Sequence, residues 1–169
     1  MEGKTGINSK RAVFLCTEFN MGMGKEAIKR MEALSAESDE DILIVISSYG
    51  GCCRTMLAIR DAMKRSRCRI NTLVLGKAMS AGCYILVTSA ATGVRAVTKD
   101  CQIMIHGPNG VAPLNEKGLG NMEYYYDVVK EHFKEDANFD DEKLDQHLDR
   151  DFYFMGDQAV ELGYADVVL

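Results

Sequence analysis

The stretch that decides the fold is Gly76-Lys77-Ala78-Met79-Ser80-Ala81-Gly82-Cys83-Tyr84. It follows the apolar run 70–75, which is typical of a buried strand, and it leads into an apolar segment that we expect to be helical through Ala90. Ser80 therefore lies where a strand gives way to a helix. The first N–H groups of a helix lack intrahelical partners, and the helix dipole favours negative charge there. A serine in this position suits a nucleophile whose attack generates an oxyanion.

The same position also suits an ordinary capping serine, whose hydroxyl accepts a hydrogen bond from the first turn of the helix. Helix caps are far commoner than nucleophiles, so this stretch alone favours the capping role by about two to one. The choice between the two roles depends on what the rest of the chain brings to Ser80.

Composition limits the class of protein. The chain has 169 residues, which predicts a single domain, and its 47% apolar and 27% charged residues are ordinary globular usage. The net charge of −5 argues against nucleic acid or an anionic membrane as the main partner. No run approaches the roughly 18 apolar residues of a membrane span, and the first residues lack the apolar core of a signal peptide.

The cysteines indicate a reducing compartment. None of the six forms a C-x-x-C pair and most lie inside apolar segments, so we expect no metal and no cofactor, and buried reduced thiols in the cytoplasm. They are Cys16, Cys52, Cys53, Cys68, Cys83 and Cys101.

Strand and helix patterns alternate from residue 11 to residue 106, which predicts an α/β fold with a largely parallel sheet. After residues 107–110 the chain becomes charged and helical, and this later part is expected to project from the sheet; His132 and His147 within it are expected to be solvated. We expect strands at 11–16, 41–46, 70–75, 94–97, 102–105 and 165–169, and helices at 25–37, 52–65, 80–90, 121–133 and 156–162.

Three features fall at the ends of expected strands. Gly50-Gly51 ends one strand, Ser80 ends the next, and His106 closes a later one. Ligands collect at the carboxyl ends of the strands in an open α/β sheet, so these features are expected to meet. A glycine loop could supply one oxyanion donor and the N–H of Ala81 another, although a tight turn or a phosphate cradle also fits the glycines. His106 is then the natural general base, if it is not simply a structural histidine.

A base of this kind needs an orienting carboxylate. Asp149 and Asp151 are the late candidates, and the pattern alone does not choose between them.

These motifs resemble those of the Clp protease proteolytic subunits (ClpP), over about residues 11–168. The family's strand ends in S-P-G-G, its nucleophile motif is G-Q-A-A-S-M-G, and I-M-I-H is followed by a proline. Near the C-terminus it has R-D-x-F-L-S-A-x-E-A-V-E-Y-G-L-V-D, and this last match selects Asp151. The corresponding stretches here are 46–51, 76–82, 103–108 and 150–166.

The resemblance implies a ClpP/crotonase-like α/β fold in a single domain 1–169, with a head at 11–110 and 151–169 and a protruding helical handle at about 111–150. It implies a serine endopeptidase that cleaves unfolded proteins and peptides. Ser80 would be the nucleophile, His106 the base and Asp151 its orienter, with Gly51 and Ala81 as oxyanion donors. It also implies heptameric rings stacked into a tetradecamer, and an ATP-dependent Clp-type unfoldase as partner.

The sequence departs from the family motifs at several places. Tyr49 replaces the proline of S-P-G-G, Lys77 replaces the motif glutamine, and Ala81 replaces a methionine, which a backbone donor tolerates. The segment before the first strand is also short for the family's axial loops.

Three rival interpretations stay open. A crotonase-type acyl-CoA enzyme would share the fold but would not need Ser80, His106 and Asp151 together. A Ser–Lys protease would use Lys77 as the base. A non-catalytic assembly subunit is the third possibility.

Overall fold

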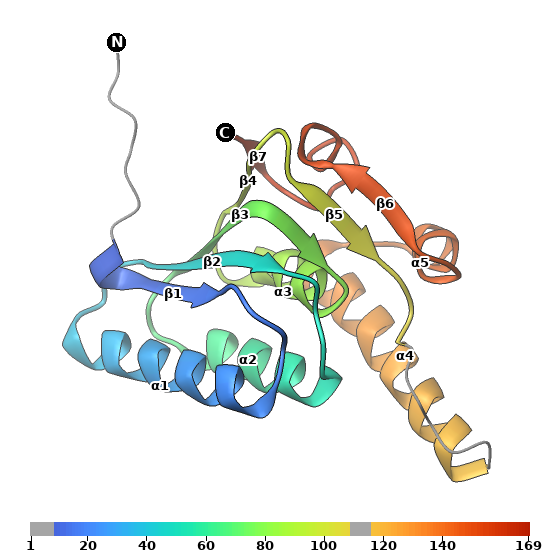
Figure 1. Ribbon diagram of the computed structural model, residues 1–169, viewed down its shortest axis with the longest axis horizontal. Coiled ribbons are helices and arrows are strands. Elements are labelled where there is room, and N and C mark those ends of the chain that lie inside the picture. Colours follow the sequence, from blue (N-terminus) through green and yellow to red (C-terminus); the bar gives the residue numbers. More distant parts are fainter. Residues whose placement is uncertain (1–8, 109–115) are drawn as a thin grey trace.

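The computed structural model describes residues 9–108 and 116–169, and the side chains of residues 10–108 and 122–169. Within these residues a seven-stranded sheet carries helices against it (Figure 1). The polar start of the chain and the beginning of the expected handle lie largely outside the described residues. The strands are β1 Ala12–Leu15, β2 Ile42–Ser48, β3 Ile70–Met79, β4 Arg95–Val97, β5 Gln102–Ile105, β6 Phe152–Met155 and β7 Val167–Val168. The helices are α1 Met21–Glu37, α2 Cys53–Arg65, α3 Ala81–Thr88, α4 Glu116–Ala137 and α5 Asp141–Leu148, with 3-10 turns at Ser9–Arg11, Ser89–Ala91 and Gly156–Gln158.

The sheet is mostly parallel, which confirms the expected α/β class. The main order is β1-β2-β3-β4-β7, and all of these neighbours run parallel. β5 pairs in parallel with the C-terminal end of β3, beyond the residues that pair with β4. β6 runs antiparallel to β5 and was not expected from the sequence.

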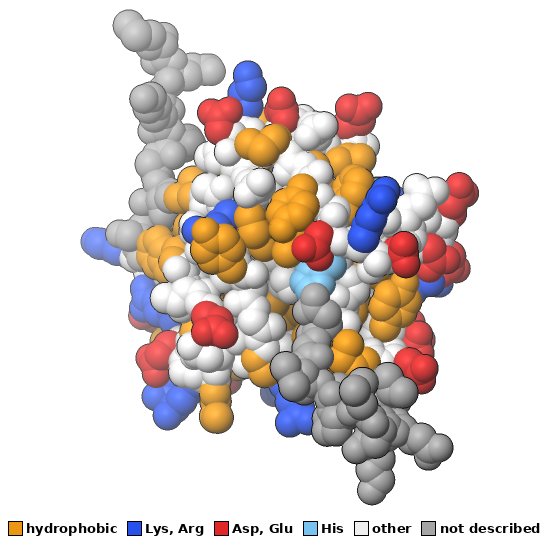
Figure 2. Space-filling view, turned by 45° about the vertical axis from the view of Figure 1, so that its right-hand side comes forward, with side chains coloured by type: hydrophobic (Ala, Val, Ile, Leu, Met, Phe, Trp, Pro, Cys, Tyr) orange, Lys and Arg blue, Asp and Glu red, His pale blue; other side chains and the backbone are white. Residues whose placement is uncertain are grey.

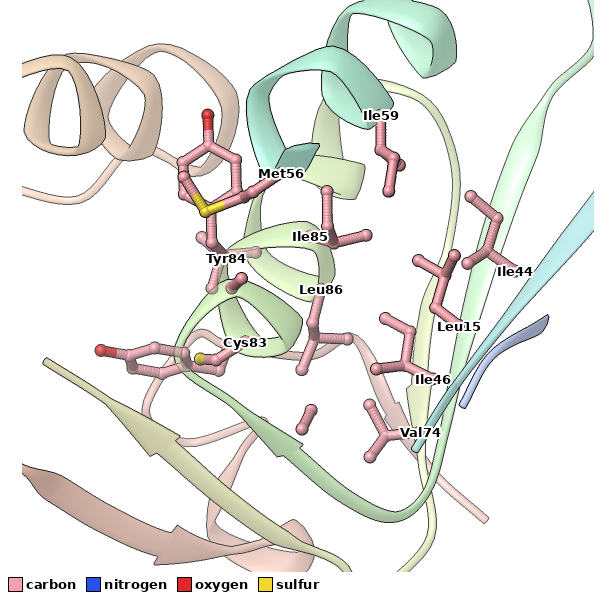
Figure 3. Close-up of a cluster of buried hydrophobic side chains, with 14 of the residues drawn as sticks. Leu15, Ile44, Ile46, Met56, Ile59, Val74, Cys83, Tyr84, Ile85 and Leu86 are labelled. Carbon is pink, nitrogen blue, oxygen red and sulfur yellow. The ribbon is translucent and has the colours of Figure 1, made fainter. Parts of the chain in front are cut away.

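Helices α1, α2 and α3 lie on the same side of the sheet (Figure 1). Every residue of α3 is buried, as expected of a helix that is apolar all round and sits inside a core. Figure 3 shows Leu86 of α3 pointing toward Ile46 and Val74 of the sheet, with Ile85 on the side of Ile59 of α2. The helix that follows Ser80 is therefore held from all sides.

Helix α1 begins at Met21, four residues earlier than expected, because Asn20 caps it through the N–H of Met23. Gly24 does not break the helix. A Cβ on Gly24 would lie 2.6 Å from Cγ2 of Thr55, so this glycine allows α1 to pack closely against α2.

The C-terminal elements are shorter than expected. The helix expected at 156–162 is a 3-10 turn at Gly156–Gln158 followed by further turns, and the strand expected at 165–169 is the two-residue β7.

Helix α4 has two parts with different surroundings. Figure 1 shows its N-terminal end projecting away from the sheet. Its later turns pack inward, because Val129 and Phe133 are buried in the core of their own subunit and the Phe133 ring lies 5.7 Å from that of Tyr84. The helical pattern of the sequence places Val129 and Phe133 on one apolar stripe, which predicts burial against a second subunit; for these two residues that interpretation is wrong. Tyr124 stays 58% exposed.

No helix in the described parts of the chain combines the length and apolar character needed to cross a membrane.

Candidate active site

Ser80 stands alone between β3 and α3, in a backbone conformation that non-glycine residues rarely adopt. Its φ is 50° and its ψ is −117°. Such a conformation costs on the order of 1–3 kcal/mol and must be held by its surroundings. Here the Ser80 N–H donates to Met104 O at 2.8 Å, and Ser80 O accepts from the N–H of Tyr84 at 2.9 Å.

The Ser80 hydroxyl does not cap the helix. Ser80 occupies the N-cap position of α3, but its side chain makes no capping hydrogen bond and is half-buried. The simple capping role considered from the sequence is therefore wrong, and the hydroxyl is left available.

The Gly50-Gly51 loop lies directly against Ser80. Both glycines have positive φ, 101° and 142°. A Cβ on Gly50 would lie 2.8 Å from Cβ of Ser80 and 3.0 Å from N of Ala81. Only a residue without a side chain lets the loop come this close, which explains the paired glycines physically.

The loop is fixed by the backbone of Phe19. The N–H of Phe19 donates to Gly50 O at 2.8 Å, and the N–H of Cys52 donates to Phe19 O at 2.7 Å. The Gly51 N–H between them and the Ala81 N–H make no hydrogen bond within the described residues. Two free donors thus flank Ser80, as an oxyanion site requires.

His106 follows the strand next to that of Ser80. Met79 of β3 pairs with Met104 of β5, so the two strands deliver Ser80 and His106 to the same edge of the sheet. His106 is half-buried, and the N–H of Gly107 donates to Leu148 O at 2.8 Å, which ties this loop to the end of α5.

The strand pairing brings Asp151 beside His106. Ile105 of β5 and Phe152 of β6 form the last pair of this antiparallel register, so His106 and Asp151 are the next residues of the two segments beyond it. Asp149 lies two residues further along.

A hollow of about 440 Å³ is lined by His106, Asp149 and Asp151, among others, but not by Ser80. Asp151 is exposed, and no hydrogen bond links the side chains of Ser80, His106 and Asp151 within the described residues. Figure 2 shows a histidine lying against an acidic side chain, with hydrophobic side chains around them.

The other two histidines are not solvated, contrary to expectation. His132 is half-buried and its Nδ1 hydrogen-bonds the phenol of Tyr84. Burial, and secondly the positive charge of Arg60, hold the pKa of His132 below its ordinary value.

His147 is buried and packs in the core. Its ring stacks on Phe152 at 3.9 Å between centroids, and its Nδ1 lies 2.9 Å from the Tyr164 hydroxyl. Burial, followed by the nearby charge of Lys143, lowers the pKa of His147.

The side chain of Lys77 contacts Tyr49 and not Ser80. Its Nζ lies 4.0 Å from the centroid of the Tyr49 ring, which is 71% exposed.

Two residues that shape the site, Phe19 and Tyr126, could not be predicted from the sequence pattern. Phe19 acts through its backbone, and Tyr126 of α4 packs so closely on Gly107 that a Cβ there would lie 3.1 Å from its ring. Both contacts depend on tertiary structure.

All six cysteines are free, but they are not all buried: Cys16 and Cys52 are exposed. Burial raises the pKa of the Cys83 and Cys101 thiols. Among the described residues, no group of three His, Cys, Asp or Glu side chains is arranged to hold a metal ion.

Comparison with known proteins identifies relatives over nearly the whole chain. The family model for Clp protease matches residues 4–169. The ATP-dependent Clp protease proteolytic subunit 2 of Bacillus licheniformis is 32% identical, with 94% of this chain and 86% of the relative aligned. Subunit 1 of Gloeobacter violaceus is 31% identical over 94% of this chain and 83% of its own, and subunit 2 of Mycolicibacterium paratuberculosis is 29% identical over 95% and 83%.

Proposed function

The chain belongs to the Clp protease family as a serine peptidase of the proteolytic-subunit type, and on this premise we propose that Ser80, His106 and Asp151 form its catalytic triad. The observation that carries the proposal is the strained backbone of Ser80, which holds an uncapped hydroxyl beside two free N–H donors. The substrates are unfolded proteins and peptides.

The reaction follows from these positions. The Ser80 hydroxyl attacks the peptide carbonyl carbon while the imidazole of His106 takes its proton. The N–H groups of Gly51 and Ala81 stabilise the oxyanion that forms. When the C–N bond breaks, His106 gives the proton to the leaving amine. Water then attacks the acyl-Ser80 ester, passes a proton to His106, and releases the acid as Ser80 regains its hydrogen.

Asp151 orients the imidazole and stabilises its charged form. The register of β5 and β6 supports Asp151 over Asp149 for this role. The contact of Lys77 with Tyr49 supports His106, not Lys77, as the base.

Replacement of the nucleophile tests the proposal. Ser80→Ala should abolish both cleavage of a fluorogenic peptide and labelling by a fluorophosphonate, without changing the far-UV circular dichroism. Ser38→Ala, on the loop after α1, is the matched control. Cleavage by Ser80→Ala at the wild-type rate would refute the triad, and cleavage without fluorophosphonate labelling would favour the Ser–Lys alternative or another mechanism.

Assembly is part of the proposal: the chain forms heptameric rings that stack into a tetradecamer. The projecting end of α4, with Tyr124 58% exposed, supports a contact with a second copy. Sedimentation velocity should give a mass near fourteen subunits, and Tyr124→Glu should lower it. A monomeric wild type would contradict this part alone.

ATP dependence would come from a partner unfoldase in the cytoplasm. The chain has neither G-x-G-x-x-G nor G-x-x-x-x-G-K-[ST], while its relatives are called ATP-dependent. The six free thiols support a reducing compartment. Peptide cleavage should proceed without ATP, and degradation of a folded protein should need both ATP and an unfoldase.

A further inference from the structure

Two departures from the family motifs touch each other beside the candidate active site. Tyr49 and Lys77 replace a proline and a glutamine of those motifs, and Nζ of Lys77 lies 4.0 Å from the centroid of the Tyr49 ring. An ammonium over an aromatic face is attracted by the ring's electrons, so the exposed ring holds the flexible lysine in one place. The two substitutions thus make one structural unit.

This unit borders the Ser80 side of the proposed catalytic apparatus. Tyr49 directly precedes Gly50, which packs against Ser80. Lys77 lies on β3 three residues before Ser80, which is about 10 Å along a strand. A bound peptide in extended form has the same rise per residue. Lys77 therefore comes within reach of substrate side chains about two to four residues from the scissile bond.

The charge of Lys77 is not neutralised by the described residues. Lys77 takes part in no ion pair or hydrogen bond there, although acidic residues outnumber basic ones by 25 to 20 in the whole chain. The Tyr49 ring occupies only the side of the ammonium that faces it, so the N–H donors on the other side stay available to a ligand. A carboxylate is the group that complements such a cation.

We propose that Lys77, positioned by Tyr49, is a specificity-determining residue that favours an Asp or Glu side chain two to four residues from the cleaved bond. This inference rests on the proposed peptidase function and names a substrate class for it. The preference is expected on one side of the bond only, because Lys77 lies to one side of Ser80 along β3.

A peptide series tests the preference. Each fluorogenic peptide carries one Glu, or its neutral counterpart Gln, at one position from four residues before to four residues after the bond. The measured quantity is the Glu/Gln ratio of kcat/KM at each position. In the wild type it should rise about three- to fivefold at one position, as for an exposed ion pair, and should fall towards one in 0.5 M NaCl.

Variants assign the effect to the two residues. Lys77→Gln should bring the ratio to about one and Lys77→Glu should invert it. Tyr49→Leu, which removes the ring but keeps an apolar side chain, should lower it part of the way. Lys29→Gln removes the same charge from the exposed surface of α1 and should leave the ratio as in the wild type.

Fluorescence anisotropy can measure the binding of the same Glu and Gln peptides to the Ser80→Ala protein. This compares the affinities for the two peptides without turnover. Ser80-dependent cleavage with equal ratios at all positions would overturn this inference and leave the peptidase function intact. Cleavage that persists in Ser80→Ala would overturn the peptidase mechanism instead. If Lys77→Glu left the Glu/Gln ratio of kcat/KM unchanged, Lys77 would not determine specificity. If Lys77→Gln lowered the sedimenting mass, Lys77 would have a role in assembly instead.

Discussion

The phenol of Tyr84, one helical turn after Ser80 on α3, hydrogen-bonds Nδ1 of His132 on α4. Burial raises the pKa of the Tyr84 phenol and lowers the pKa of His132, so two neutral groups form this bond. The helix behind the proposed nucleophile is thereby tied to the helix that projects from the subunit.

Removing the Tyr84 hydroxyl should weaken the fold. Tyr84→Phe keeps the ring in the core but leaves Nδ1 of His132 without its partner, which should reduce the free energy of unfolding by about 1 kcal/mol. Urea denaturation measures the change. Tyr125→Phe removes an exposed bond from Arg54 and should change it by less than about 0.5 kcal/mol. If the two substitutions changed the free energy of unfolding equally, the buried Tyr84–His132 hydrogen bond would not be the more stabilising of the two.

Stability should fall between pH 7.5 and pH 5.5. The folded state holds the pKa of His132 and His147 below the ordinary value, so the unfolded chain binds more protons in this range. The two histidines contribute fully to the free energy of unfolding above about pH 6.5, their ordinary pKa. This contribution is lost as the pH falls towards the lower pKa values that they have in the folded state. Urea midpoints at the two pH values measure it.

The double variant His132→Gln, His147→Gln should flatten this pH dependence. Hydrogen bonds and charge from Lys64 lower the pKa of Glu135, and at Asp166 those from Arg95 together outweigh burial, which raises the pKa. Both carboxyl groups therefore titrate only below about pH 4.5, outside the range from pH 5.5 to pH 7.5. A wild type equally stable at both pH values would count against the assignment.

The ion pair between Arg60 of α2 and Asp136 of α4 should be the most sensitive charged contact. Its atoms lie 2.6 Å apart and its side chains are 6% and 1% exposed. Arg60→Ala leaves the buried carboxylate of Asp136 with Lys64 alone, 3.1 Å away, and should cost about 3 kcal/mol of unfolding free energy. Arg67→Ala, in the exposed pair with Asp39, is the control and should cost less than about 1 kcal/mol.

Gly50→Ala should impair catalysis directly. The added Cβ would meet Ser80 Cβ and Met79 O at 2.8 Å each, at a φ of +101°. The loop must then move away from Ser80, so the rate of fluorophosphonate labelling should drop by about 10²-fold, as when one oxyanion donor is lost. Gly22→Ala, where the nearest atom is a side-chain oxygen 3.3 Å away, should label at the wild-type rate.

Asp151→Asn should lower kcat by as much as about 10⁴-fold, because the imidazole loses its orienting carboxylate. Asp149→Asn changes the same type of side chain in the same hollow and should cost little. If Asp149→Asn proved the more damaging, the assignment from the β5–β6 register would be wrong.

Secondary structure is predicted best from the sequence where the local apolar pattern and the tertiary structure agree. The strand–Ser80–helix junction and the strand before His106 follow from apolar runs of clear length. The β3 strand still extends four residues beyond the expected end, through Gly76 and Lys77, because its far end pairs with β5. That pairing is made by distant residues.

The errors have physical causes of the same kind. β6 was missed because Phe152–Met155 is a short run without alternation, defined as a strand only by its partner β5. His132 and His147 lie in a charged segment, but each lies on the inner face of its helix and finds a tyrosine hydroxyl. Neither hydroxyl is near in sequence.

The two halves of the candidate site differ in how they are anchored. Gly51 and Ser80 adjoin central strands that are paired on both sides. Asp151 leads into β6, which among the described residues pairs only with β5. Edge elements open at lower free energy than central ones. On gentle heating, β6 amides should therefore exchange with deuterium before those of β3. Peptidase activity should then vanish at a temperature where the core is still folded, and should return at once on cooling.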